Sequence, residues 1–423
     1  MNLKILFLAW LTCVSCVSAQ RRYDSYRGLV MAGYQGWFNT PVDGANRGWH
    51  HYGNKQEFKP GNCSIDFWPD VSDYSVLYKT PFRFPDGTTA YTFSSQDSST
   101  VDVHFQWMQD YGIDGVFMQR FVTEIKSRKG KSHFNKVLKY ALSSAQRTGR
   151  AIAVMYDLSG MSPGDERVLL DDMDQLEKEY RLKSGKKAPT YLYHNGKPLV
   201  AVWGIGFDDK RKYGLNEADK IIDGLRKRGY SVMIGVPTYW RELKVDAVSD
   251  ARLHGIIKKC DIVLPWFVGR YDEASYEAFR QDIAKDLEWC RQNGVDYAPL
   301  CYPGFSWRNK RGPESFYVDR NAGSFFWKQF ASVIASGAEM IYVAMFDEID
   351  EGTAIFKCVN RSHVPGNNKI KFDGIEDHLP TDYYLWLTGE AGKMLRKEVD
   401  FTPSVPPRPG NPAAPLINDE IIK

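Results

Sequence analysis

The sequence predicts an α/β fold, a (β/α)8 TIM barrel, from three observations. Eight short runs of apolar, β-branched or aromatic residues recur along the chain, and amphipathic stretches separate most of them. The runs are nearly continuous in apolar residues, as expected for strands that are buried on both faces of a parallel sheet. No GxGxxG follows the first run, which argues against the main alternative, an open doubly wound sheet.

The elements follow one another in the order that a barrel requires. The predicted strands are 28–34, 114–121, 151–157, 198–204, 230–236, 261–267, 296–302 and 340–346. Helical periodicity is evident at 133–149, 216–229, 276–294 and 324–338, and several of these stretches contain a Gly at or near their ends, typical of a helix C-terminus. Strand–helix alternation indicates parallel pairing through right-handed crossovers.

The ends of the chain and one insertion lie outside this pattern. Residues 1–19 read as a signal peptide, because a short apolar run follows Lys4 and Val17-Ser18-Ala19 fits a cleavage site. We therefore expect an exported protein, periplasmic or secreted, with one domain over 20–400; a lipid anchor on Cys16 fits poorly. The Trp-, Tyr-, Pro- and Gly-rich insertion at about 38–100 should lie on the active face, because it follows the first strand. The Pro-rich tail, 401–423, is expected to be extended or disordered.

The bulk composition narrows the function classes. A net charge of +3 gives no reason to expect nucleic acid or an anionic membrane as a partner. No membrane span is expected after the signal peptide, and a monomer is the expected state. Aromatic residues make up 14% of the chain, which fits either a large core or a cleft lined with rings for sugars. Five cysteines remain after cleavage, enough for one or two disulfides and at least one buried thiol.

Chemistry in such barrels belongs to the carboxyl ends of the strands. In this chain those ends carry aromatic and polar residues that suit sugar rings and hydroxyls. They are Tyr34, Gln35, Trp37, Gln119, Arg120, Tyr156, Asp157, Trp203, Trp266 and Tyr302.

The eighth strand runs into "FDEIDEGT" (346–353), in which four carboxylates fall within five positions. A solvated acidic turn and a Ca²⁺ site are the structural alternatives, although the spacing is not that of an EF-hand. The position after the last strand favours chemistry. Glycoside hydrolysis usually needs one protonated and one ionised carboxyl group, and neighbouring acids drive their pKa values apart.

Three segments together resemble glycoside hydrolase family 99 and its family 71/99-like relatives, the endo-α-mannosidases and endo-mannanases. "DEIDEGT" resembles the family's E-x-x-E-G-T signature, "GYQGWFNTPVDGANRGWHHY" (33–52) its opening strand and aromatic loop, and "PLCYPGFSWRNKRG" (299–312) its Pro-Gly-aromatic loop. The resemblance covers roughly 28–395 and implies the barrel fold and a retaining glycosidase that needs no cofactor and no metal.

The resemblance also implies roles for the two glutamates. Glu348 would deprotonate the substrate's 2-hydroxyl, which attacks the anomeric carbon to give a 1,2-anhydro sugar. Glu351 would act as general acid and then as general base. The chain departs from the family at Ile349 and Asp350, where an aromatic residue and a His are typical, and at Asp347, where the neighbour is usually Asn-like. These departures put the mannose specificity in doubt more than the catalytic pair.

Other residues are candidates for substrate binding with structural alternatives. Trp37 and Trp49 are equally suited to a stacking platform and to the core. Of the adjacent histidines, His50 is preferred for the cleft, since neighbours on an extended loop point in opposite directions. Arg308 and Asn309 lie in the family-like loop and could bond to sugar hydroxyls.

The sequence therefore predicts an exported retaining glycosidase that acts on an α-linked, mannan-like glycan, with an oligo- or polysaccharide as its partner. An α-glucan-active hydrolase of the same barrel class and a non-catalytic carbohydrate-binding barrel are the alternatives. A metal-dependent hydrolase or deacetylase that uses the acid cluster and His50 is a weaker third.

Overall fold

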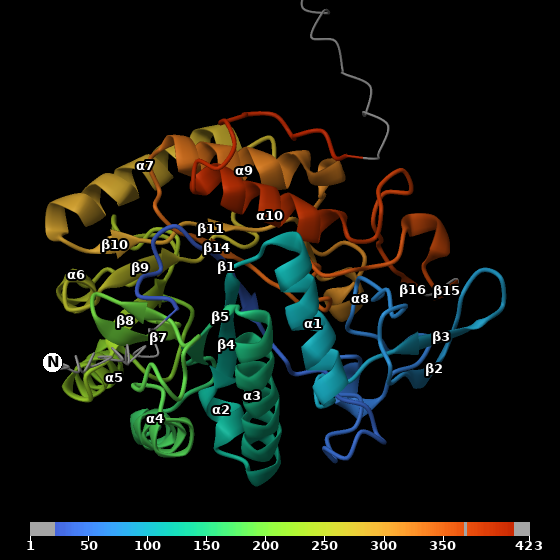
Figure 1. Ribbon diagram of the computed structural model, residues 1–423, viewed down its shortest axis with the longest axis horizontal. Coiled ribbons are helices and arrows are strands. Elements are labelled where there is room, and N and C mark those ends of the chain that lie inside the picture. Colours follow the sequence, from blue (N-terminus) through green and yellow to red (C-terminus); the bar gives the residue numbers. More distant parts are fainter. Residues whose placement is uncertain (1–21, 368–369, 410–423) are drawn as a thin grey trace, which may run out of the picture.

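The computed structural model describes residues 22–367 and 370–409. Eight parallel strands form a barrel at the centre of the molecule (Figure 1). In order around the barrel they are β1 (Val30–Tyr34), β4 (Gly115–Phe121), β5 (Ala151–Asp157), β7 (Lys197–Trp203), β8 (Ser231–Val236), β9 (Ile262–Pro265), the β10–β11 segment, and β14 (Ile341–Val343). Each lies within or overlaps one of the eight predicted runs, so the predicted (β/α)8 barrel is confirmed.

The β10–β11 segment closes the barrel. Its first part, β10 (Asp296–Tyr297), pairs with β9, and its second part, β11 (Leu300–Cys301), pairs with β14. Between them, Ala298 N donates to Val263 O at 2.9 Å, and Tyr342 N donates to Pro299 O at 3.0 Å. One continuous segment thus joins both ends of the sheet.

Helices surround the barrel, with α7, α9 and α10 along one side in Figure 1. The helices of more than one turn are α1 (Ser98–Tyr111), α3 (Arg128–Thr148), α4 (Glu166–Tyr180), α5 (Leu215–Lys227), α6 (Arg252–Ile257), α7 (Tyr276–Asn293), α9 (Ser324–Ala335) and α10 (Tyr383–Leu395). The short helices are α2 (Val122–Ile125) and α8 (Arg308–Arg311). Gly149 and Gly294 end α3 and α7 with φ of 66° and 67°, the left-handed geometry that favours Gly at a C-terminus.

The insertion after β1 is mostly irregular, as predicted, and contains an antiparallel hairpin of β2 (Tyr78–Arg83) and β3 (Thr89–Thr92). The hairpin lies beside the small ribbon formed by β15 (Gly366–Asn367) and β16 (Ile370–Lys371) (Figure 1). The Phe82 and Phe372 rings meet there with centroids 5.5 Å apart. Chain segments far apart in sequence therefore pack together at this place.

The predicted signal peptide, with Cys13 and Cys16, lies outside the described residues. Within 22–367 and 370–409, no helix combines the length and apolarity needed to cross a membrane. The described part of the tail packs against α9 and the start of α10. Trp327 Nε1 donates to Thr402 O at 3.1 Å, and Arg408 pairs with Asp382 at 2.7 Å. The five described cysteines are all buried and unpaired, so none of the disulfides considered from the sequence is present.

Candidate active site

A cavity of about 440 Å³ opens at the carboxyl ends of the barrel strands. Aromatic rings form much of its wall, and carboxylates and arginines lie among them. The lining residues are Gln35, Trp37, Gln119, Phe121, Met155, Asp157, Ser159, Trp203, Phe207, Asp209, Arg211, Trp266, Val268, Gly269, Arg270, Phe305, Trp307, Phe316, Glu348 and Glu351. Rings with a few convergent polar groups suit a ligand that has both flat apolar faces and hydroxyls.

The four acids of the segment after β14 separate into two pairs. Glu348 and Glu351 line the cavity, whereas Asp347 and Asp350 do not. Asp347 and Asp350 are fully buried behind the cavity wall. The acidic segment is therefore not a solvated turn.

Glu348 is held at both carboxylate oxygens. Gln35 Nε2 donates to Oε1 at 2.7 Å, and Thr353 Oγ1 donates to Oε2 at 2.9 Å. Burial raises the pKa of Glu348 well above its usual range, and the negative charges of Glu351 and Asp350 add to this. When ionised, this carboxylate is a stronger base than an exposed one.

Glu351 lies beside a lysine that the sequence analysis did not single out. Lys310 Nζ is 3.4 Å from Glu351 Oε1 and 3.9 Å from Asp350 Oδ2. Burial raises the pKa of Glu351, and the ammonium group of Lys310 opposes that rise. Lys310 belongs to α8, which is anchored where Asn309 N donates to Asp66 Oδ1 at 2.9 Å.

Asp347 fixes the loop that follows β1. Its two oxygens accept from the backbone N–H groups of Gln35 and Gly36 at 2.7 and 2.8 Å. Burial raises the pKa of Asp347 to about 7. Because Gln35 in turn bonds to Glu348, Asp347 positions the side chain that positions the candidate base.

Asp350 fixes a second loop through His51. His51 Nδ1 is 2.9 Å from Asp350 Oδ2, so Nδ1 carries the proton and donates. Burial lowers the pKa of His51 to about 4, which keeps the imidazole neutral. The ring stacks on Trp37 with centroids 3.6 Å apart and planes 7° apart, and Trp37 forms part of the cavity wall.

Only some of the aromatic residues predicted to bind substrate line the cavity. Trp37, Trp203 and Trp266 line the cavity. Tyr34, Tyr156 and Tyr302 do not: each is fully buried with its hydroxyl bonded behind the wall, to His104, Asp172 and the Tyr271 carbonyl respectively.

The side-chain alternation of a strand explains this outcome. Met155 and Asp157 face the cavity, so Tyr156 between them faces the helices, where it bonds to Asp172 of α4. Gln119 likewise faces the cavity, whereas Arg120 pairs with Asp172 at 2.8 Å. Of the two strand-end residues named from the sequence, Asp157 therefore enters the cavity and Tyr156 does not, and burial raises the pKa of Asp157 to about 6.

Four more predicted residues lie outside the cavity lining. Trp49 packs on Tyr52 and Phe58, with ring centroids 5.8 and 5.3 Å away. His50 Nε2 lies 3.6 Å from Glu124, so His51 and not His50 is the histidine joined to the acidic segment.

The remaining two, Arg308 and Asn309, hold α8 in place. The Arg308 guanidinium lies 3.5 Å from the centre of the Tyr317 ring, and Asn309 Nδ2 donates to Ile65 O at 2.9 Å. In the described part of the chain, no cluster of three or more His, Cys, Asp or Glu side chains is arranged to hold a metal ion.

Comparison with known proteins agrees with the barrel. Residues 187–371 match the model of a domain of unknown function, DUF5010. No curated protein matches the chain. The GH99 endo-α-mannosidase of Bacteroides thetaiotaomicron in complex with bis-tris-propane is 17% identical, with a TM-score of 0.60 over 89% of this chain and 98% of that one.

A second structure of that mannosidase is 16% identical, with a TM-score of 0.61 over 88% of this chain and 99% of the other. A glycoside hydrolase-like protein is 13% identical, with a TM-score of 0.49 over 77% and 92% of the two chains. The two matches to the mannosidase show that the chain has its fold.

Proposed function

We propose that this protein is an exported glycoside hydrolase that cleaves an α-linked, mannan-like glycan with retention of configuration. Glu348 is the base toward the 2-hydroxyl of the substrate, and Glu351 is the general acid and later the general base. The observation that carries the proposal is that these two glutamates, three positions apart, enter one ring-lined cavity at the active end of the barrel.

The chemistry needs two carboxyl groups in opposite protonation states. In the first step Glu348 takes the proton of the 2-hydroxyl, O2 bonds to the anomeric carbon, and the glycosidic bond breaks. Glu351 gives its proton to the departing oxygen. In the second step water attacks the anomeric carbon while Glu351 takes its proton, the bond between the anomeric carbon and O2 breaks, and O2 recovers a proton from Glu348.

The surroundings of the pair favour a site in which the two carboxyl groups together hold one proton. Burial and mutual repulsion raise both pKa values, which disfavours double ionisation and favours a pair that holds one proton. The donors Gln35 and Thr353 stabilise an ionised Glu348 in a fixed orientation. The raised pKa of Glu348 gives its ionised form the basicity needed toward a hydroxyl.

An α-mannoside is the preferred substrate because its axial 2-hydroxyl is trans to the leaving group, which in-line attack on the anomeric carbon requires. The fold shared with an endo-α-mannosidase supports this choice. Asp350 stands where the resembling family has a different residue, and its bond to His51 places it behind the wall. Specificity therefore depends more on the lining residues Asp157, Trp203 and Arg211.

Defined α-mannans and α-glucans, with products sized by mass spectrometry, provide the test. The wild type should release sugars from a mannan, and Glu348→Gln and Glu351→Gln should each lower turnover at least about a thousandfold while glycan binding persists. Glu390→Gln is the matched control, because Glu390 forms a pair with Lys393 on α10. Near wild-type activity in either active-site variant contradicts the assignment.

The same experiment separates the enzyme from a carbohydrate-binding barrel. Wild-type protein that binds a glycan on an array without releasing any product is a lectin, and the proposed reaction is then wrong. If the protein cleaves α-glucans but not mannans, the catalytic role of the two glutamates is supported and the proposed substrate is wrong.

A further inference from the structure

The hairpin formed by residues 305–318 carries a row of rings that leads away from Glu351. Phe305, Trp307 and Phe316 all line the cavity. The ring centroids of Phe305 and Trp307 are 4.9 Å apart, and those of Phe305 and Phe316 are 6.1 Å apart. Phe305 is buried, whereas Phe316 is 50% exposed, so the row ends at the rim.

The inner end of the row is fixed to the catalytic segment. Ser306 N donates to the backbone carbonyl of Glu351 at 2.8 Å. Gly352 permits this approach, because a Cβ at that position would lie 2.9 Å from Ser306 N. Burial raises the pKa of Glu351, and Trp307 lies close enough to offset a small part of that rise, although the buried Nε1 of Trp307 makes no well-aligned hydrogen bond.

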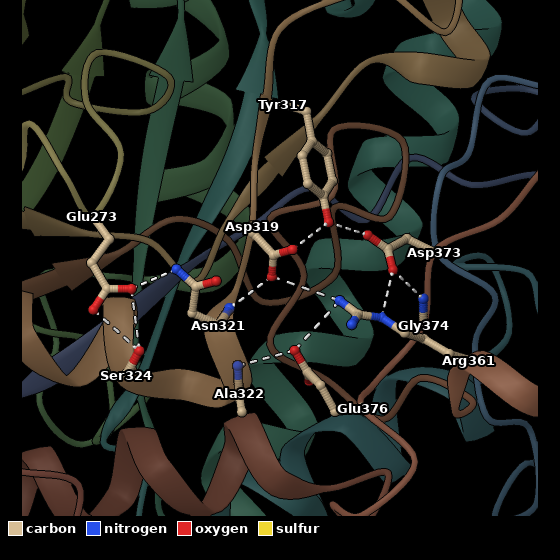
Figure 2. A network of polar contacts seen from close by, with 10 residues as sticks. All are labelled: Glu273, Tyr317, Asp319, Asn321, Ala322, Ser324, Arg361, Asp373, Gly374 and Glu376. Carbon is tan, nitrogen blue, oxygen red and sulfur yellow. Dashed lines mark hydrogen bonds and ion pairs between the residues drawn. The ribbon is translucent and has the colours of Figure 1, made fainter. Parts of the chain in front are cut away.

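The base of the hairpin is tied to the rest of the molecule by the polar network in Figure 2. Tyr317 Oη donates to Asp373 at 2.6 Å, and Arg361 bonds to Asp373 at 3.1 Å and pairs with Asp319 at 3.7 Å. The strands β12 (Phe305–Ser306) and β13 (Tyr317–Val318) pair with each other at the base of the hairpin. Because these contacts hold the hairpin, the exposed ring of Phe316 has a fixed position before any ligand binds.

Protein groups support the rings of Phe316 and Trp307 from one side. Gly269, also in the cavity wall, faces Phe305 and Phe316, and a Cβ there would lie 3.8 Å from Phe305 Cδ1 and 3.7 Å from Phe316 Cε1. Arg311 covers one face of Trp307 at 3.5 Å from the ring centre, which holds the indole in place. A ring held from one side and open on the other can stack on the face of a sugar.

We propose that the 305–318 hairpin forms a leaving-group-side subsite for successive sugar rings of a neutral oligosaccharide, with Trp307 and Phe316 as its stacking surfaces. This inference rests on the proposed function, because Glu351 as general acid protonates the departing oxygen and so identifies the side on which the row begins. The substrate is then cleaved inside a chain, and the released portion spans the row.

A chain-length series tests the subsite. The probes are α-mannooligosaccharides of two to six residues, with kcat/KM measured for wild type, Phe316→Ala and Phe401→Ala. Phe401 is the matched control because it is 52% exposed and lies against α7 and α9, away from the barrel mouth. Wild-type kcat/KM should rise with chain length, and Phe316→Ala should reduce the ratio of longest to shortest by about tenfold.

A second measurement is independent of turnover. Calorimetric titration of Glu351→Gln with the longest oligosaccharide should show weaker binding when Phe316→Ala is added and unchanged binding when Phe401→Ala is added. Equal losses on all chain lengths, or no change in the ratio, overturn the subsite while leaving the hydrolase intact. Absence of any cleavage or binding by the wild type refutes the hydrolase and, with it, the subsite.

Discussion

The side-chain amide of Gln35 donates to Glu348 at 2.7 Å, and the backbone N–H of the same residue donates to Asp347 at 2.7 Å. One residue at the end of β1 is thus held by the first acid of the segment after β14 while it orients the second. Since β1 and β14 are neighbours in the barrel, this contact joins the first and last barrel strands at the candidate active site.

Gln35→Leu should lower kcat about tenfold to a hundredfold with little change in KM, because misplacement of a catalytic group by a fraction of an ångström is costly. The conservative Gln35→Asn shortens the reach to Glu348 and should also lose activity. The circular dichroism spectrum should remain that of wild type. An unchanged kcat in both variants would show that Thr353 alone orients Glu348.

Lys310→Met and Asp350→Asn should move the pH–rate profile in opposite directions. Lys310 lowers the pKa of both Glu348 and Glu351, and Asp350 raises both. Loss of Lys310 therefore raises both values, and the bell-shaped profile of kcat/KM moves to higher pH. Loss of the Asp350 charge lowers both values and moves the profile to lower pH.

Asn at position 350 retains an oxygen to accept from His51, so the Trp37 wall is preserved in that variant. Lys310→Arg retains the positive charge and serves as the control, with a profile close to wild type. Shifts of the same sign in the two charge-removing variants would mean that they act through structure and not through charge.

The barrel could be predicted from the sequence because parallel strands buried on both faces leave apolar runs that few other folds need. The interruption of the seventh strand could be anticipated less well. Pro299 has no N–H to donate, so at this residue the pairing with β14 uses only the Pro299 carbonyl, which accepts from Tyr342 N at 3.0 Å.

Burial of both strand faces makes the strands easy to predict, but it prevents the sequence from indicating which side chains enter the cavity. In β5, Met155, Tyr156 and Asp157 are all compatible with either face, because both faces of the strand are buried. Only the register within the closed barrel shows that Asp157 faces the cavity and Tyr156 faces Asp172. His51 and Lys310 approach the acids from segments distant in sequence, and no local pattern signals such a contact.

Activated leaving groups should distinguish the two glutamates. The fluoride ion of a mannosyl fluoride leaves without protonation. The rate of the first step in Glu351→Gln should therefore be much closer to wild type on the fluoride than on an oligosaccharide. Glu348→Gln should be inactive on both substrates, because attack by the 2-hydroxyl still needs a base. Fluoride release measured with an ion-selective electrode provides the rate, and the reverse pattern would exchange the two roles.

Arg320 should contribute more to stability than any of the surface arginines. Its guanidinium is buried between Phe67 and Tyr384, with the ring centres 4.1 and 4.6 Å away, and donates to the carbonyls of Gly352 and Ala354 at 3.0 and 2.7 Å. Those carbonyls follow Glu351, so the same contacts fix the end of the catalytic segment. Arg320→Met leaves both acceptors buried without a donor, at an expected cost of about 2–4 kcal/mol in the free energy of unfolding.

Chemical denaturation followed by tryptophan fluorescence measures this cost. Arg308→Met is the control, since Arg308 stacks on Tyr317 at an exposed position and should change the free energy by about 1 kcal/mol or less. At a temperature where Arg320→Met is fully folded, kcat should also fall, because the segment carrying Glu351 loses its support. A stable variant with wild-type kcat would show that the hydrogen bonds of the Thr353 backbone and side chain to Glu348 suffice to hold the segment.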